Sequence, residues 1–214
     1  AANMVESAGN YSRHRIVPII NRVYNEDGSI EYELAYLAGI SGQAISNAYT
    51  RALADISIKR GLPICGACSR YELIGGFPKR PNLEDGDSID KRVKECVVED
   101  ITGFMATKEK TKEKTEEKRG SGEGQSIRRT SAVMFSYMVP DTDTVRHSPP
   151  IPQFHVRYGR SDVKGEQAIY NVEASSAIYR LLIAIDVDKI GRLSDGSYVD
   201  DRERRIRTAF DALI

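Results

Sequence analysis

Three short basic clusters are the residues of this sequence best suited to bind a charged partner. Each combines arginine with hydroxyl or imidazole donors, and such groups hold phosphates through charge-assisted hydrogen bonds. Lys+Arg and Asp+Glu both number 31, so the formal net charge is zero and any basic surface must be local. The pattern favours a groove for a nucleic-acid backbone. The clusters are Ser12-Arg13-His14-Arg15, Arg128-Arg129-Thr130-Ser131, and His155 with Arg157 and Arg160.

Two further features could contact the same partner. Ser41 and Gly42 open a predicted helix, whose first amides lack intrahelical partners, and a glycine lets a phosphate approach closely. An ordinary serine cap is the alternative explanation. His155 and Arg157 lie two residues apart on a predicted strand, so their side chains share one face. That histidine could stack on a base or donate to a phosphate, or it could be a half-buried strand residue with a backbone partner.

Motifs of the common enzyme classes are absent from the sequence. It has no GxxxxGK(S/T) loop, no HExxH and no GxSxG. The three histidines include no pair at a metal-ligand spacing, and no catalytic residue is predicted. The acidic residues that a metal-dependent nuclease would need are expected to be solvated loop and strand-end residues. They are Asp141, Asp143, Asp186 and Asp188.

The cysteines Cys65, Cys68 and Cys96 are an odd number, which argues against a disulfide scaffold. The CxxC of the first two is half of a zinc-site motif, and no second CxxC or paired histidine follows it. Two interpretations of this motif are therefore open: a weakly indicated metal site, or simple packing of small residues after a helix. We expect no metal and no cofactor.

The length of 214 residues indicates a single domain over 1–214. The sequence has no run of about 18 apolar residues, and residues 1–10 do not resemble a signal peptide. A cytoplasmic protein is expected.

The elements that position these residues indicate an α+β fold, a sheet with helices on one face. A hairpin is predicted over 16–24 and 30–37 around an Asp-Gly turn, and a second over 153–158 and 167–172. Helices are predicted over 43–59, between a Ser41 cap and a Gly61 stop, and over 88–101. A last helix from about Arg202 has capping-box spacing of Asp200 and Glu203 and a buried stripe of Ile206, Phe210 and Leu213. Strands are predicted over 132–139 and, as the best buried strand, over 177–187.

Residues 107–119 differ from the rest of the chain. They contain six basic residues and four Glu and no apolar side chain, so they cannot fold alone. The segment 106–126 is predicted to be a flexible basic arm. It is either a solvated surface loop or an arm that closes over a nucleic acid.

Several strings, in one order along nearly the whole chain, resemble the archaeal Cas-seven (DevR-type) CRISPR-associated family, above all the backbone subunit of type I-A Cascade. That family starts with a strand before the present first residue and continues past Ile214, so the resemblance suggests a chain incomplete at both ends. The arm is also longer and more charged than the family pattern. The matching strings are Asn10, Arg13-His14-Arg15, Ile40-Ser41-Gly42-Gln43-Ala44, Gly103-Phe104-Met105, Arg128-Arg129-Thr130-Ser131, Gln153-Phe154-His155-Val156-Arg157 and residues 167–179.

The resemblance implies a modified RNA-recognition (ferredoxin-like) fold with inserted lobes and a thumb-like β-hairpin, here at about 146–170. It implies a non-catalytic subunit that forms a helical filament along crRNA in antiviral defence and meets target DNA through that RNA. The implied partners are copies of itself and other Cascade subunits, with no membrane. The alternatives are a metal-dependent ribonuclease of the type III backbone kind and a scaffold that contacts only protein. The expected RNA-binding residues are Asn10, Arg13, His14, Arg15, Ser41, Gly42, Gln43, Arg128, Arg129, Ser131, His155 and Arg157.

Overall fold

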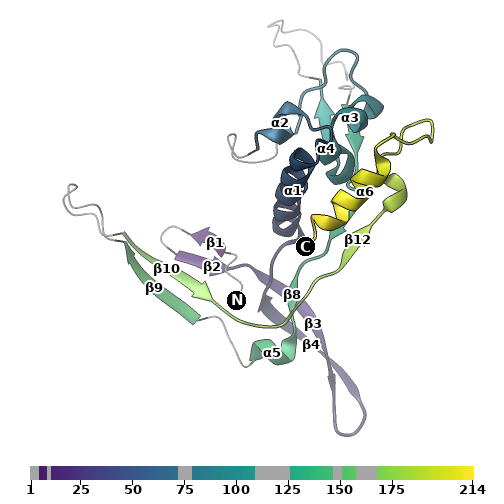
Figure 1. Ribbon diagram of the computed structural model, residues 1–214. Coiled ribbons are helices and arrows are strands. Elements are labelled where there is room, and N and C mark those ends of the chain that lie inside the picture. The colour runs from purple at the N-terminus through teal and green to yellow at the C-terminus, as the bar shows by residue number, and fades with distance from the viewer. Residues whose placement is uncertain (1–4, 9–10, 72–78, 109–125, 147–150, 158–167) are drawn as a thin grey trace, which may run out of the picture. The chain divides into compact units, whose positions relative to one another are not determined.

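The computed structural model describes residues 5–8, 11–71, 79–108, 126–146, 151–157 and 168–214. The chain is α+β and forms two compact units, each built from two stretches of sequence. Unit 1 comprises Ala1–Ile45 and Phe135–Ile183, and unit 2 comprises Ser46–Met134 and Ala184–Ile214. Figure 1 shows the elements of both units. Among the described helices, none is long and apolar enough to cross a membrane.

Unit 1 contains a four-stranded sheet in the order β1-β2-β10-β9. The strands are β1 (Val5–Ala8), β2 (Tyr11–His14), β9 (Ile151–Arg157) and β10 (Ala168–Ala174). Antiparallel pairing of β9 with β10 confirms the predicted second hairpin, whereas β2 pairs with β10 in parallel. The sequence analysis missed β1 and β2 because these four-residue strands are too short to show apolar alternation.

The first predicted hairpin is confirmed in unit 1. It is formed by β3 (Ile16–Tyr24) and β4 (Ile30–Ala38), which pair along their whole length. Gly28 closes the turn with a φ of 80°, a conformation that glycine adopts without steric cost, and its amide donates to the carbonyl of Asn25 over 3.0 Å. The short strands β8 (Val139–Pro140) and β11 (Tyr179–Arg180) pair with each other, and α5 spans Thr142–Arg146.

Unit 2 is mainly helical around a small apolar core. Helix α1 (Gly42–Lys59) enters it and buries Leu53 and Ala54 beside the apolar residues of the following helices. The other helical segments are α2 (Gly66–Ser69), α3 (Ile89–Glu95), α4 (Val97–Thr102), η1 (Val187–Lys189) and α6 (Arg202–Asp211). A hairpin of β5 (Phe104–Thr107) and β6 (Ser126–Arg129) follows α4, and β7 (Val133–Phe135) pairs with β12 (Ile183–Ile185).

The helix predicted over 88–101 is wrong in one respect, because two helices replace it. Ser88 caps α3 by accepting from the amide of Lys91, as a helix start requires. Cys96 is then extended, with φ −148° and ψ 110°, and the amide of Val97 donates to the carbonyl of Pro63 over 2.9 Å. A long-range hydrogen bond has therefore replaced one that would continue the helix.

The predicted buried stripe of the last helix is also wrong. α6 buries Arg205, Thr208 and Ala209, and Phe210 is 45% exposed. The predicted capping box of Asp200 and Glu203 does not form. Asp201 is the N-cap residue instead, and its carboxylate accepts from the Nε of Arg205. The helix therefore buries the face that carries Arg205, which has ion-pair partners there, and leaves its most apolar face partly exposed.

The strand predicted over 177–187 is interrupted and is not buried. β11 pairs with β8 and β12 pairs with β7, and between these pairs Leu182 is 72% exposed. The segment over 132–139 is divided in the same way, into β7 and β8. The single sheet that was expected is not formed among the described residues, where five separate small sheets occur instead.

Candidate nucleic-acid interface

The four-stranded sheet of unit 1 brings two of the predicted basic clusters into one element. β2 carries Arg13 and His14, and it pairs with β10, whose other neighbour is β9. On β9, the backbone of His155 pairs with Tyr170 and that of Arg157 with Ala168. The two clusters thus lie on strands that flank β10. The side chains of these four basic residues, together with Asn10 and Arg160, lie outside the described part of the chain.

The pairing with β10 also places the two clusters at different positions along the strand direction. Ser12 pairs with Val172, so Arg13 lies beyond it toward the end of β10, whereas Arg157 pairs with Ala168 near its start. The offset between Arg13 and Arg157 is five residues along β10, about 17 Å at the usual rise per residue. This separation suits an extended phosphate backbone better than a single small anion. Arg15 follows β2 and is exposed.

Ser41, Gly42 and Gln43 lie at the start of α1. The Ser41 hydroxyl accepts from the amide of Ala44 over 3.2 Å, which confirms the predicted serine cap. A Cβ on Gly42 would lie 2.4 Å from the carbonyl oxygen of Phe135. The chain itself therefore occupies the space that the missing side chain leaves. Of the three residues, Gln43 is exposed.

We expect Gly42→Ala to destabilise the protein by about 1–3 kcal/mol, because the new methyl group meets rigid backbone. Thermal unfolding of this variant, with the exposed neighbour variant Gln43→Ala as control, measures the effect. An unchanged unfolding midpoint together with weakened RNA binding would contradict this packing explanation and would favour a phosphate at the helix start.

Arg129 and Ser131 are engaged by the interior of unit 2. An Nη of Arg129 lies 2.6 Å from an oxygen of Asp100, its Nε donates to the Asp100 carbonyl over 3.0 Å, and its side chain is 8% exposed. The hydroxyl of Ser131 donates to the carbonyl of Val133 over 2.6 Å. These groups hold the end of β6 in place, with the Arg129 side chain mostly buried and Ser131 half-buried.

Arg128 lies on the opposite, exposed face of the β5–β6 hairpin. It pairs with Met105, which is 69% exposed, and the next pair on that face is Thr107 with Ser126. Residues on one face of a strand alternate, so the exposure of Arg128 and the burial of Arg129 have the same cause. Arg128 is therefore the member of the second cluster whose guanidinium can reach a phosphate.

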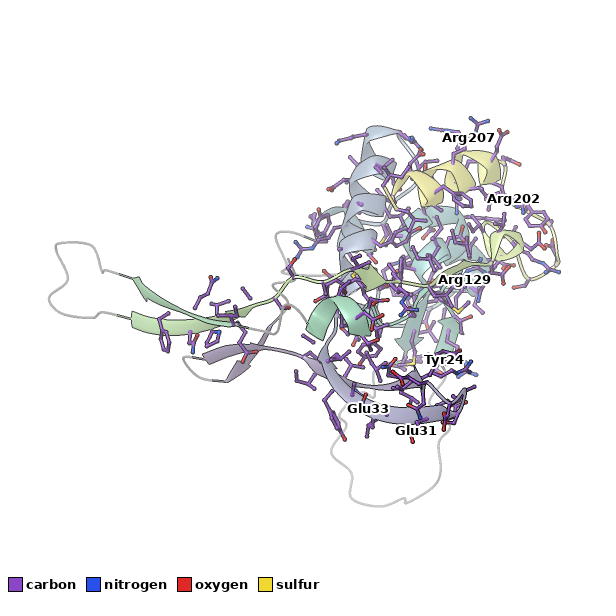
Figure 2. The ribbon with its side chains drawn as sticks, turned by 90° about the horizontal axis from the view of Figure 1, so that it is seen from below. Tyr24, Glu31, Glu33, Arg129, Arg202 and Arg207 are labelled. Carbon is purple, nitrogen blue, oxygen red and sulfur yellow. The ribbon has the colours of Figure 1, made fainter. Side chains whose placement is uncertain are left out.

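An exposed aromatic face on the β3–β4 hairpin was missed by the sequence analysis. Tyr24, Tyr32 and Tyr36 are each about two-thirds exposed, and the guanidinium of Arg22 lies 5.8 Å from the ring centre of Tyr32. Figure 2 shows Tyr24 on this hairpin with Glu31 and Glu33, which the pairing assigns to the other face. Exposed aromatic rings beside arginine can stack on bases. The alternating apolar residues of 30–36 carried this signal, but alternation alone indicates a core face.

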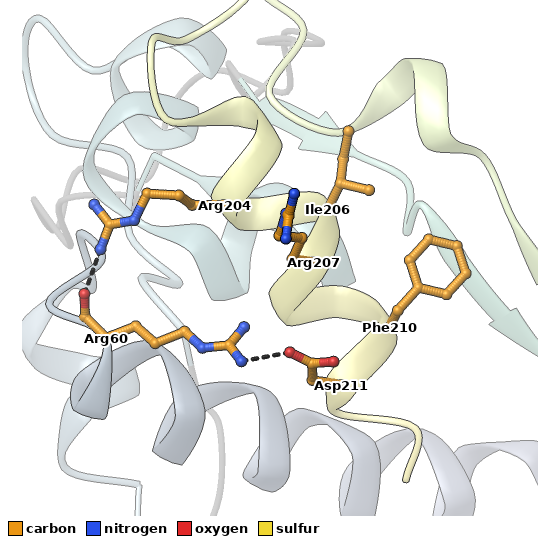
Figure 3. A pocket seen from close by; sticks show the side chains of 6 residues that line it. All are labelled: Arg60, Arg204, Ile206, Arg207, Phe210 and Asp211. Atoms are coloured by element: carbon orange, nitrogen blue, oxygen red, sulfur yellow. Dashed lines mark hydrogen bonds and ion pairs between the residues drawn. The ribbon is translucent and has the colours of Figure 1, made fainter.

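A basic pocket of about 490 Å³ in unit 2 was missed as well. Arg60, at the end of α1, faces Arg204 and Arg207 of α6 there, and Phe210 lines it too (Figure 3). Arg60 pairs with Asp211, and the Arg204 guanidinium donates to the Arg60 carbonyl. The pocket contributes positive charge, but these two guanidiniums already have partners in the protein.

Three of the four acidic residues considered for catalysis have ordinary structural contacts. Asp141 pairs with Arg180 at 3.0 Å, Asp186 accepts from the amide of Lys189 over 3.2 Å, and Asp188 lies 3.8 Å from Arg202. Across the described ranges, no three acidic or histidine side chains converge as a group that could hold a metal ion.

The three cysteines do converge, which the sequence analysis did not anticipate. Cys65, Cys68 and Cys96 place their sulfur atoms within 4.8 Å of one another, and the last two are buried. Hydrogen bonds with Cys68 and Cys96 lower the pKa of the Cys65 thiol. The hydrogen bond with Cys65, aided by burial, raises the pKa of Cys68 and raises that of Cys96 to about 11. The thiols thus interact as one group.

Comparison with known proteins identifies the class. A family described as CRISPR-associated negative auto-regulator DevR/Csa2 matches residues 1–214. The chain belongs to this DevR/Csa2 family of CRISPR-associated proteins, which confirms the resemblance drawn from the sequence.

Two curated relatives, both from Saccharolobus solfataricus, give a more specific comparison than the family does. CRISPR-associated protein Cas7/Csa2 1 is 32% identical over 228 residues, which cover 99% of this chain and 65% of the relative. CRISPR-associated aCascade subunit Cas7/Csa2 2 is 32% identical over 235 residues, which cover 99% of this chain and 66% of that protein. The chain thus spans about two-thirds of the length of these relatives.

Proposed function

We propose that this chain is a non-catalytic guide-RNA-binding subunit of a CRISPR surveillance (Cascade) complex. Copies of it would assemble along crRNA as a helical backbone in the cytoplasm, beside other Cascade subunits, and would meet target DNA through that RNA. The proposal includes a modified RNA-recognition fold for the whole protein, with the β9–β10 hairpin as its thumb. Family membership and a relative named as an aCascade subunit support it.

The observation that carries RNA binding is the parallel pairing of β2 with β10. It puts the cluster at Arg13 and the cluster at His155 into one sheet, although about 140 residues separate them in sequence. We propose that this sheet holds phosphates in unit 1, where Ser41, Gln43 and the exposed tyrosine face add contacts. We propose separately that Arg128 of unit 2 contacts a phosphate. Gly42 would fix the backbone at the start of α1, and Arg129 and Ser131 would fix the backbone beside Arg128.

The ribonuclease alternative requires several carboxylates that converge on a metal ion. Asp141, Asp186 and Asp188 are instead held separately, by Arg180, by the Lys189 amide and by Arg202. The test is incubation of the purified protein with labelled RNA and Mg²⁺. Intact RNA after long incubation is expected, and metal-dependent cleavage that co-purifies with the protein would reverse the assignment.

RNA affinity should fall steeply with salt and depend little on sequence, because the proposed contacts are mainly to phosphates. With several phosphate contacts, we expect a loss on the order of 10- to 100-fold between about 50 and 200 mM salt. Fluorescence anisotropy with labelled single-stranded RNAs of different sequence measures both properties. A flat salt response, or strong preference for one sequence, would count against the proposal.

Arg128→Ala should weaken RNA binding by a few-fold and reduce the salt slope by about 1, because one phosphate contact is lost. The matched control is Lys91→Ala, which removes the same charge from an exposed position on α3 outside the proposed surface. Thermal unfolding should be nearly unchanged in both. Equal RNA affinity of the two variants would remove Arg128 from the interface.

A further inference from the structure

The cysteine cluster joins two segments of unit 2 that are distant in sequence. Cys65 is the N-cap residue of α2 and Cys68 lies within that helix, whereas Cys96 lies at the corner between α3 and α4. The three sulfur atoms lie within 4.8 Å of one another, and all three cysteines are free thiols. Three soft ligand atoms therefore face one common point.

The break in the helix at Cys96 is part of this arrangement. Its extended backbone interrupts what would be a continuous helix, and the next amide, of Val97, bonds to the carbonyl of Pro63 two residues before Cys65. That hydrogen bond fixes the Cys65 segment against the corner. The helix is therefore interrupted at Cys96, the residue whose sulfur lies beside those of the other two cysteines.

We propose that Cys65, Cys68 and Cys96 bind a single metal ion, Zn²⁺ or a similar thiolate-preferring cation. This metal site is independent of the proposed RNA-binding function. Zn–S bonds of about 2.3 Å in a tetrahedron put sulfur atoms about 3.8 Å apart, and small side-chain movements give that spacing from the present one. Iron–sulfur clusters use four cysteine ligands and hold them farther apart. A mononuclear, thiolate-preferring ion therefore fits these three sulfurs better.

Nearby charges suit a thiolate centre. Three thiolates and a divalent cation leave one negative charge in a largely buried site. The ammonium of Lys79 interacts electrostatically with Cys68 and Cys96, and the guanidinium of Arg80, which also pairs with Glu95 and Glu99, interacts with Cys65. Metal binding displaces the thiol protons into solvent, so these cations then face thiolates. The fourth ligand is not among the described His, Cys, Asp and Glu side chains, and water can supply it.

The bound ion would cross-link the segment after α1 to the α3–α4 corner. This corner leads directly through α4 to Gly103 and the β5–β6 hairpin that carries Arg128. A metal cross-link here stabilises the helical core of unit 2, as structural zinc does in small domains.

The first test uses the unaltered protein, purified without a metal-binding tag. Elemental analysis should find about one zinc per chain, and Co²⁺ exchange should give the visible absorption of a tetrahedral thiolate site with sulfur-to-metal charge transfer. Chelation should lower the unfolding midpoint by roughly 10 °C, the shift expected for loss of a tightly bound ligand. Metal-free protein with no Co²⁺ spectrum would overturn the proposal whatever any variant does.

Variants then identify the ligands. Cys65→Ser and Cys96→Ser should each lose zinc and the Co²⁺ charge-transfer band, whereas Ser69→Ala, in the same short helix, should keep both. Alkylation without reductant, followed by mass spectrometry, tests the redox alternative. If Cys65 and Cys68 form a disulfide in the native protein and only Cys96 is alkylated, the segment is a redox pair and the metal assignment is wrong.

Discussion

Asp100→Ala is expected to destabilise the protein by about 3–5 kcal/mol, because it leaves two buried arginines without their shared acid. One oxygen of Asp100 lies 2.6 Å from Arg129, and the other lies 3.0 Å from Arg205 and accepts from the amide of Gly191 over 2.9 Å. Asp100 is fully buried, and Arg205 is 1% exposed. Arg129 would then have carbonyl partners but no carboxylate, and Arg205 would keep its ion pair with Asp201 but lose the buried one.

Chemical and thermal unfolding followed by circular dichroism measure this effect, with a drop in midpoint on the order of 10 °C. The matched control is Asp188→Ala, which removes an acid that is 85% exposed and 3.8 Å from Arg202. An exposed ion pair of this kind contributes about 0–1 kcal/mol. Similar stability of the two variants would mean that the buried cluster does not hold α4, β6 and α6 together as described.

Gly103→Ala should cost at least about 2–3 kcal/mol, because this position excludes a side chain for two independent reasons. Its backbone has φ 71° and ψ 170°, a region that is essentially restricted to glycine. A Cβ there would also lie 2.4 Å from the carbonyl oxygen of Arg129 and 2.7 Å from the amide nitrogen of Ser131. The substitution would push β6 away from the end of α4.

Gly61→Ala is the control that separates these two causes. Gly61 also has a positive φ, of 61°, but a Cβ there would meet no atom within 4 Å. We expect it to cost about 1 kcal/mol, the conformational penalty alone. RNA binding by Gly103→Ala should fall together with its folded fraction. If Gly103→Ala is no less stable than Gly61→Ala, then the close approach of β6 to Gly103 is not maintained in solution.

Local patterns were sufficient where neighbouring residues decide the structure. The Asp-Gly turn and the alternating strands on either side of it predicted the β3–β4 hairpin, and Ser41 predicted the start of α1. The family was also readable from the sequence, because the order of several short strings along the chain is itself specific. Each of these features depends on contacts within a few residues or on the residue order alone.

Other features depend on contacts between residues that are distant in sequence, and only the tertiary structure shows them. Nothing in residues 88–101 indicates a break at Cys96, because the amide that causes it bonds to Pro63, more than thirty residues earlier. The sequence predicted Arg128 and Arg129 alike as RNA-binding residues, but the position of Asp100 turns Arg129 inward and leaves Arg128 outside. The sequence by itself determined the residue types available for binding. Packing determined which of them face solvent, because burial of an arginine depends on a carboxylate that the fold alone brings to it.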